Sequence, residues 1–200
     1  MSFLILFILV LPTGHASDDL VFLDAKTFDF SIVLDIRYAT PKNFLKQAVY
    51  PEARCLLRSP VAKALSRVQS ALKLLGLRLK VFDCYRSLSV QKKMWALVAD
   101  EKYVADPSKG SRHNRGAAVD VTLVDSFGKE LEMPSDYDDF SEKAARACPR
   151  CPPKAKANRV LLEKKMMAEG FVPFDTEWWH FDFKGWERFP IEDVTFSSLK

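Results

Sequence analysis

The spacing of apolar residues predicts three helices. The clearest covers residues 61–75, where apolar side chains recur every three or four positions, the period of a helix with one buried face. Gly76 follows as a natural helix end. A second helix is expected after Ser89, whose hydroxyl can cap its N-terminus, and a third covers residues 158–169, just before Gly170.

Shorter segments with a period of two predict strands. Apolar and polar residues alternate over residues 31–40, and leucine or valine alternates with basic residues over 77–81. Residues 117–123 are apolar enough for a further strand. Residues 171–174 and 178–183 are predicted to form a hairpin, because a tight turn separates them.

The order of these elements predicts an α+β fold in a single domain. Residues 43–58 and 125–153 show no sustained period and are predicted to be loops. Two hundred residues fit one domain, and no internal repeat or interdomain linker is visible. Helices lie between strands that need not be parallel, so we expect a mainly antiparallel sheet packed against helices.

The N-terminus has the pattern of a secretory signal peptide. Residues 3–11 are an unbroken apolar run, and Gly14 and Ala16 supply the small residues of a cleavage site before Ser17. We therefore expect a signal peptide over residues 1–16 and an exported, periplasmic mature chain. No Lys or Arg precedes the run, so an uncleaved apolar N-terminus is the alternative. The run is shorter than the about 20 residues that span a bilayer, and no membrane span is expected.

Composition narrows the class of partner. The chain is 48% hydrophobic and 12% aromatic, enough for a packed core. Its 30 basic and 26 acidic residues give a net charge of +4 without a Lys/Arg cluster. This distribution disfavours nucleic acid as a partner.

Four cysteines favour two disulfides in an exported protein: Cys55, Cys84, Cys148 and Cys151. Cys148 and Cys151 could close a local loop, which would leave Cys55 to pair with Cys84, although four cysteines allow three pairings. A redox-active Cys-x-x-Cys or a four-thiolate zinc site is the competing interpretation.

Two of the three histidines lie near carboxylates that suggest a metal site. Removal of the signal peptide would leave His113 and His180 as the only histidines. Asp120 lies within an apolar strand, where a carboxylate without a partner is unfavourable. Two imidazoles and one carboxylate form a ligand set for a catalytic zinc with one open position. Glu177, three residues before His180, is placed to act as a base.

Each candidate also has a simpler structural explanation. His180 could be a hydrogen-bonded core histidine. Glu177 and His180 point to opposite faces of a regular strand, so both can face a metal only if the chain bends or bulges or if Glu177 lies in the turn. Arg86 could form an ion pair with Asp83 or provide a cation where an oxyanion develops. Ser111 could be a turn residue or a substrate contact.

Several motifs in order resemble those of the zinc D-alanyl-D-alanine dipeptidases. This family belongs to the D-Ala-D-Ala metallopeptidases, which share their fold with the Hedgehog signalling domain. The match covers nearly all of the chain after the leader. The matching segments are DIRYAT from Asp35, DCYR from Asp83, SRHNRGAAVDVTL from Ser111, residues 133–140, and EWWHFDF from Glu177.

The resemblance implies one zinc ion per chain, held by His113, Asp120 and His180. It further implies that Glu177 is the catalytic base and that Arg86 stabilises the tetrahedral intermediate.

The same resemblance implies that the partner is a small dipeptide substrate. Tyr38, Ser111 and Asp138 would contact it, with Asp138 near its free ammonium group. The chain departs from the family pattern at Ser87, where a proline is usual, and at Pro134, where a glycine is usual.

The implied activity is hydrolysis of D-alanyl-D-alanine to two D-alanines by a metal-activated water. One alternative is a D,D-carboxypeptidase or peptidoglycan endopeptidase of the same fold, which would need an open groove. A non-catalytic zinc-binding module is a second alternative. Such a module would be expected to lack the base or the arginine, whereas Glu177 and Arg86 are both present.

Overall fold

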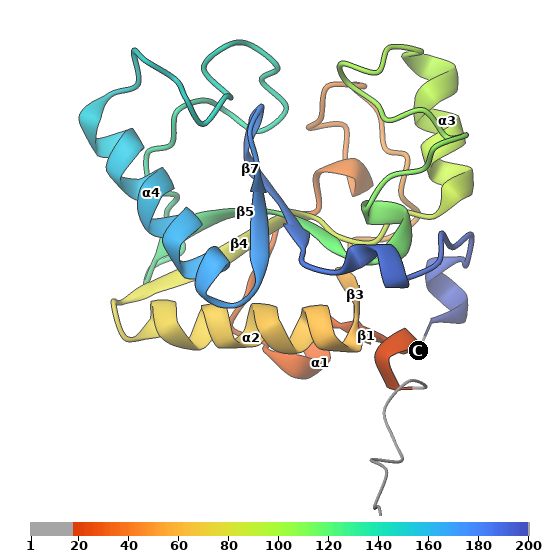
Figure 1. Ribbon diagram of the computed structural model, residues 1–200, viewed down its shortest axis with the longest axis horizontal. Coiled ribbons are helices and arrows are strands. Elements are labelled where there is room, and N and C mark those ends of the chain that lie inside the picture. The colour runs from red at the N-terminus through yellow and green to blue at the C-terminus, as the bar shows by residue number, and fades with distance from the viewer. Residues whose placement is uncertain (1–17, 200) are drawn as a thin grey trace, which may run out of the picture.

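The computed structural model describes residues 18–199. The described residues form a five-stranded sheet, a two-stranded sheet and four α-helices (Figure 1). The expected signal peptide, residues 1–16, lies outside the described residues. Among the helices that the structure describes, none has the length and apolar character needed to cross a membrane.

Helices and strands are interspersed along the chain. The α-helices are α1 (Ala25–Phe28), α2 (Ser59–Lys73), α3 (Leu88–Leu97) and α4 (Pro153–Ala168). The strands are β1 (Phe22–Asp24), β2 (Val33–Leu34), β3 (Leu56–Arg58), β4 (Leu77–Asp83), β5 (Ala118–Asp125), β6 (Phe171–Phe174) and β7 (Glu177–Phe183). The 3-10 helices are η1 (Asp18–Leu20), η2 (Arg37–Ala39), η3 (His113–Arg115), η4 (Trp186–Arg188) and η5 (Phe196–Ser198).

The main sheet has the strand order β2-β4-β5-β7-β6. Only β2 runs parallel to its neighbour, and the other pairs are antiparallel. Helix α2 packs against β4, and α4 packs against β6 and α2. In Figure 1, α2 runs beneath the sheet, while α3 and the loops that follow α3 and β5 rise on the other side. The expected α+β fold with a mainly antiparallel sheet is confirmed.

Helix α2 shows how the apolar period builds the core. Val61, Leu65, Val68 and Leu72 are fully buried on its inner face, as the sequence predicts. Leu75, which was expected on the same face, lies beyond the end of the helix and is 52% exposed. The helix ends two residues earlier than predicted.

Two strand predictions were wrong in extent. The strand expected over residues 31–40 is reduced to β2, which pairs with β4 over two residues. The chain then turns through η2, which carries Tyr38 into the core. Strand β3 lies within the predicted loop 43–58, because these three residues pair with β1 and have no alternation that marks them.

Helix α3 begins earlier than expected, and its cap is a different serine. The Ser87 hydroxyl accepts a hydrogen bond from the Val90 amide at 3.3 Å. Ser89, the predicted cap, instead donates from its hydroxyl to Asp193 at 2.6 Å. Helix α4 also begins early, at Pro153, since a proline is tolerated in a first turn.

The four cysteines form two disulfides, in one of the three pairings that the sequence allowed. Cys55 is bonded to Cys84, which ties the segment before β3 to the end of β4. Cys148 is bonded to Cys151 and closes a short loop before α4. All four thiols are therefore used in disulfides.

Candidate metal and catalytic site

Neighbouring strands place the three candidate metal ligands together. Asp120 of β5 and His180 of β7 are directly opposite each other in the antiparallel register. His113 lies in η3, just before β5. Gly116 joins these elements with a φ of 64°, and a Cβ there would lie 2.4 Å from the Phe22 ring. Glycine is thus required at the turn that presents His113.

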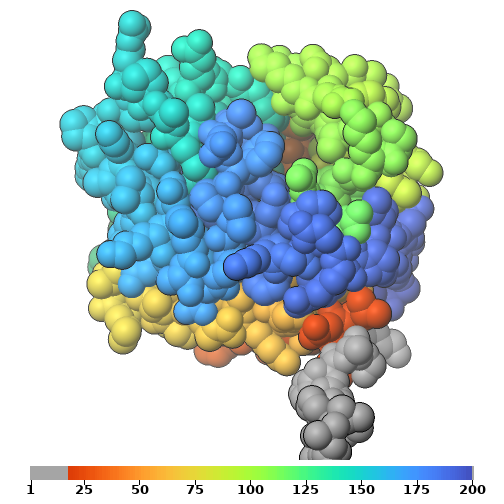
Figure 2. Space-filling view, in the orientation of Figure 1, coloured from red at the N-terminus to blue at the C-terminus, as the bar shows by residue number. Residues whose placement is uncertain are grey.

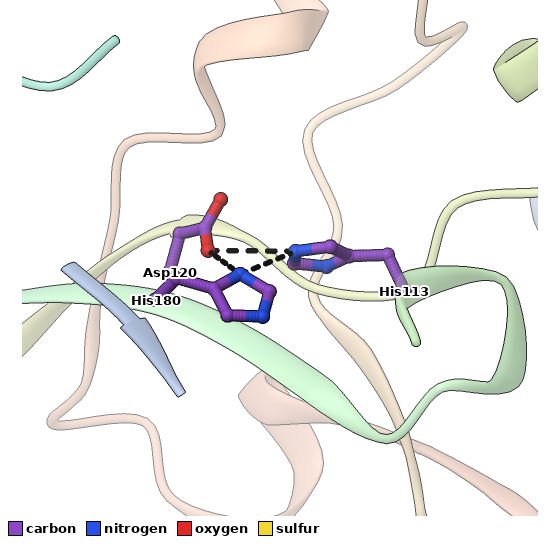
Figure 3. Close-up of side chains that lie close together, drawn as sticks. All are labelled: His113, Asp120 and His180. Carbon is purple, nitrogen blue, oxygen red and sulfur yellow. Dashed lines mark hydrogen bonds and ion pairs between the residues drawn. The ribbon is translucent and has the colours of Figure 1, made fainter. Parts of the chain in front are cut away.

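One atom from each of these side chains points to a common centre (Figure 3). His180 Nδ1 lies 2.9 Å from Asp120 Oδ1. His113 Nε2 lies 3.2 Å from His180 Nδ1 and 3.4 Å from Asp120 Oδ1. All three residues are nearly inaccessible to solvent. The arrangement brings two imidazole nitrogens and one carboxylate oxygen within reach of a single ion.

The second nitrogen of each ring faces an atom that can only accept a hydrogen bond. His113 Nδ1 lies 2.6 Å from the Cys84 carbonyl oxygen, and His180 Nε2 lies 3.0 Å from Asp182 Oδ1. A neutral ring therefore carries its proton on the side away from the centre. Lone pairs of both rings and of Asp120 then face one another, and a positive charge between them is needed. This donor set fits a metal ion.

The electrostatics of the centre favour a cation. Burial alone would lower the pKa of His180, but its hydrogen bonds with Asp120 and Asp182 raise that pKa to about 10. Burial acts against ionisation of Asp120 as well, yet the neighbouring histidines hold its pKa far below the ordinary value. The site therefore attracts either protons or a metal ion.

An irregularity in the β6–β7 hairpin resolves the orientation of Glu177. Pro173 pairs with Phe181, but the next residue, Phe174, pairs with Glu177 instead of His180. Residues 178–180 are thus extra on the β7 side, and the strand bends there. As a result, Glu177 and His180 both line the same cavity. Burial raises the pKa of the Glu177 carboxyl above its ordinary value.

All of the site residues predicted from the sequence line one cavity of about 140 Å³. They are Tyr38, Arg86, Ser111, His113, Asp120, Asp138, Glu177 and His180. In Figure 2 the molecule is hollowed between the green atoms that follow α3 and the blue atoms of the β6–β7 region. The structure therefore brings together residues from six separate segments of the chain, with none left outside.

Arg86 is held rigidly at the wall of this cavity. Its side chain donates to Asp83 Oδ2 at 2.6 Å, to Gln91 Oε1 at 2.9 Å and to the Tyr50 hydroxyl at 3.3 Å. A guanidinium has five N–H groups, so two are left after these bonds to described residues. The ion pair with Asp83, one of the two interpretations of Arg86 that the sequence allowed, is present, but it is buried and not on the surface.

Asp138 lies in the loop between β5 and α4 and adopts an unusual backbone conformation, with a φ of 61°. Its carboxylate accepts hydrogen bonds from the Tyr38 hydroxyl at 3.1 Å and from the Phe44 amide at 3.3 Å. Burial, together with the negative charge of Asp120, raises the pKa of Asp138 to about 7. This carboxylate has no cationic partner among the hydrogen bonds it makes to described residues.

Ser111 has a structural role in addition to its place in the cavity. Its hydroxyl accepts a hydrogen bond from the His113 amide at 3.2 Å, and its own amide donates to Asn114 Oδ1 at 2.7 Å. These bonds fix the start of η3. The turn-residue explanation therefore holds, and it is compatible with a substrate contact.

Sequence reasoning missed the groups that orient the ligands. The Tyr137 hydroxyl donates to Asp120 Oδ2 at 2.9 Å, and Asp182 and the Cys84 carbonyl fix the two histidine rings. Asp182 could have been found, because residues two apart on a strand share a face. The Cys84 carbonyl could not have been found, because a backbone group has no signature in the sequence. Tyr137 could not have been found either, because it reaches Asp120 from a distant loop.

Comparisons with known proteins agree with this geometry. A sequence model of the D-ala-D-ala dipeptidase family matches residues 16–196. The chain belongs to this family. The D-alanyl-D-alanine dipeptidase of Escherichia coli K12 is 35% identical over 183 residues, which are 92% of this chain and 95% of that protein. The resemblance seen in the sequence motifs is therefore confirmed.

More distant similarities extend the comparison. The D-alanyl-D-alanine dipeptidase of Enterococcus faecalis V583 is 29% identical over 74% of this chain and 83% of its own length. Among solved structures, a vancomycin-resistance D,D-pentapeptidase in complex with Zn(II) is 17% identical, with a TM-score of 0.45. That alignment covers 66% of this chain and 75% of the other.

Proposed function

We propose that this chain hydrolyses the D-alanyl-D-alanine dipeptide to two D-alanines with one zinc ion bound by His113, Asp120 and His180. The observation that supports this most strongly is the convergence of their three donor atoms in the lining of a small cavity. Membership of the D-ala-D-ala dipeptidase family supports the substrate.

Glu177 and Arg86 provide the remaining chemistry. Zinc bound at such a site supplies a polarised water and a Lewis acid for the peptide carbonyl. Glu177 lines the cavity with a raised pKa, so it can accept the proton of the attacking water and pass it to the leaving amine. The two remaining N–H groups of Arg86 can hold the negative charge that develops on the carbonyl oxygen.

The cavity suits a small charged substrate. Its volume of about 140 Å³ is well below the roughly 300–1,000 Å³ of sites for drug-sized ligands. The Asp138 carboxylate has no cationic partner among residues 18–199, and a dipeptide ammonium group would supply one. Tyr38 holds that carboxylate in place, and Ser111 lines the same cavity. We assign these three residues to substrate binding.

The two competing activities are separated by a comparison of three substrates. Purified protein would be assayed with D-Ala-D-Ala, its N-acetyl form and a cell-wall pentapeptide. A dipeptidase should cleave the free dipeptide far better than the acetylated one, because a buried carboxylate left unpaired costs about 1.5–3 kcal/mol, roughly tenfold to a hundredfold in rate. Comparable turnover of all three would indicate a carboxypeptidase. Absence of alanine release would indicate a non-catalytic module.

We also infer that residues 17–200 form an exported catalytic domain. Both disulfides fit an oxidising compartment. N-terminal sequencing of protein from the cell envelope should give a start near Ser17, and thiol titration should find no free thiol. An intact Met1 with four reactive thiols would overturn this inference.

A further inference from the structure

Three aromatic side chains from three separate loops meet beside the cavity. We call Phe44, Tyr103 and Phe140 the aromatic cap. The Phe140 ring centroid lies 4.9 Å from that of Tyr103 and 5.3 Å from that of Phe44, both edge to face. Phe44 and Tyr103 are stacked with their centroids 6.3 Å apart. Figure 1 shows the loops after η2, α3 and β5 rising on the same side of the sheet.

The cap adjoins the carboxylate that we assign to the substrate ammonium group. The Phe44 amide donates a hydrogen bond to Asp138, and Phe140 follows Asp138 by two residues. Tyr103 and Phe140 also line the cavity itself. Phe44 packs edge to face on Tyr38, which holds the other oxygen of Asp138. The cap therefore occupies the space next to the amino end of a bound dipeptide.

This position has a direct consequence for substrate length. An amino group paired with Asp138 would lie beside the cap, and we infer that a group attached to that nitrogen meets the rings of Tyr103 and Phe140. Phe140 also packs edge to face against Trp179, with ring centroids 6.3 Å apart. Tyr103 is the outermost ring, 36% exposed, on a turn whose fold depends on Asp100.

We propose that the aromatic cap determines length specificity by blocking extension of the substrate beyond its amino group. This inference rests on the proposed dipeptidase function. It assigns steric exclusion to Tyr103 and Phe140, and it assigns charge selection to Asp138. The two effects can be separated, because an N-alkyl group adds bulk but keeps the positive charge, whereas an acetyl group removes the charge.

The test measures kcat/KM for D-Ala-D-Ala and for its N-methyl, N-propyl and N-benzyl forms. The zinc-loaded wild-type protein, Tyr103→Ala and Phe140→Ala would be compared, with Tyr103→Phe as the matched control that keeps the ring. In the wild type and the control, kcat/KM should fall steeply with the size of the alkyl group. In both alanine variants, the N-benzyl form should gain about tenfold to a hundredfold relative to the free dipeptide, the range of steric discrimination in apolar pockets.

The kcat/KM of each N-alkyl form is divided by that of the free dipeptide for the same variant, so a general loss of activity cancels, and zinc content serves as the control for folding. The N-acetyl form should remain poor in every variant, since its lost charge is not restored. If the wild type cleaves D-Ala-D-Ala but the alanine variants keep its size profile, the cap assignment alone is wrong. If the wild type releases no alanine, the proposed function fails and the cap assignment fails with it.

Discussion

Tyr137 offers a test of the metal site that leaves the ligands unchanged. Its hydroxyl donates to Asp120 Oδ2 at 2.9 Å, while Asp120 Oδ1 lies 2.9 Å from His180 Nδ1, at the proposed metal site. The ring packs between Phe82 and Trp179, with centroids 4.6 and 5.4 Å away. Tyr137→Phe therefore removes one hydrogen bond to the carboxylate and keeps the packing.

The expected loss of zinc affinity follows from that bond. A hydrogen bond to a charged group contributes about 1.5–3 kcal/mol, and each 1.4 kcal/mol is a factor of about ten in affinity. The same hydrogen bond is present in the metal-free protein, so most of its free energy cancels between the free and the zinc-bound states. Only the part that orients Asp120 for zinc changes the affinity. Outer hydrogen bonds of this kind typically change metal affinity by about 10–100-fold. We expect Tyr137→Phe to weaken zinc binding about tenfold.

The assay is competition for zinc between the protein and a chromophoric chelator of known affinity. Tyr85→Phe is the control, because that buried tyrosine also loses its hydroxyl hydrogen bonds: it donates one to the Val194 carbonyl and accepts one from the Val194 amide. The control should keep wild-type zinc affinity. Wild-type affinity in Tyr137→Phe, or an equal loss in both variants, would refute the reasoning that this hydroxyl orients a zinc ligand.

Three further predictions concern the base, the ammonium site and the longer disulfide. Glu177→Gln should keep its zinc and lose about 10²–10⁴ in kcat, the contribution of a positioned base; near-normal kcat or lost zinc would contradict this role. The pKa of Asp138 is raised to about 7, and only the ionised carboxylate could hold the ammonium group as we propose, so kcat/KM should fall as pH drops through that value or slightly below it. Asp138→Asn should remove that limb of the profile, and a limb that persists would assign it elsewhere. Replacing both Cys55 and Cys84 by serine should cost about 3–4 kcal/mol in urea unfolding, since the bond closes a 29-residue separation; unchanged stability would contradict this estimate.

The fold was predictable where one segment alone decides its structure. Helix α2 could be read from its apolar period because that face is fully buried. Strand β2 could not be delimited in the same way, since the alternation continues through residues that leave the sheet at η2. Strand β3 is marked by its pairing with β1, a distant segment, and not by a pattern in its own three residues.

The site could be predicted from residue types that are rare in the chain, such as histidine, and from a carboxylate within an apolar strand, which is unfavourable without a partner. The two histidines, Asp120 and Glu177 all line the cavity. Glu177 and His180 would point to opposite faces of a regular strand, so the sequence showed that both could face a metal only through a bend or from a turn. The β6–β7 hairpin contains such an irregularity. The aromatic cap could not be foreseen, because its rings come from loops brought together only by the tertiary fold.

Stoichiometric reconstitution with zinc tests the central claim most directly. Metal-free protein would be titrated with zinc while D-alanine release from D-Ala-D-Ala is measured at each step. We expect no turnover without metal, a linear rise as zinc is added, and a plateau at one zinc ion per chain. Full turnover in the metal-free protein, or no turnover at saturating zinc, would contradict it.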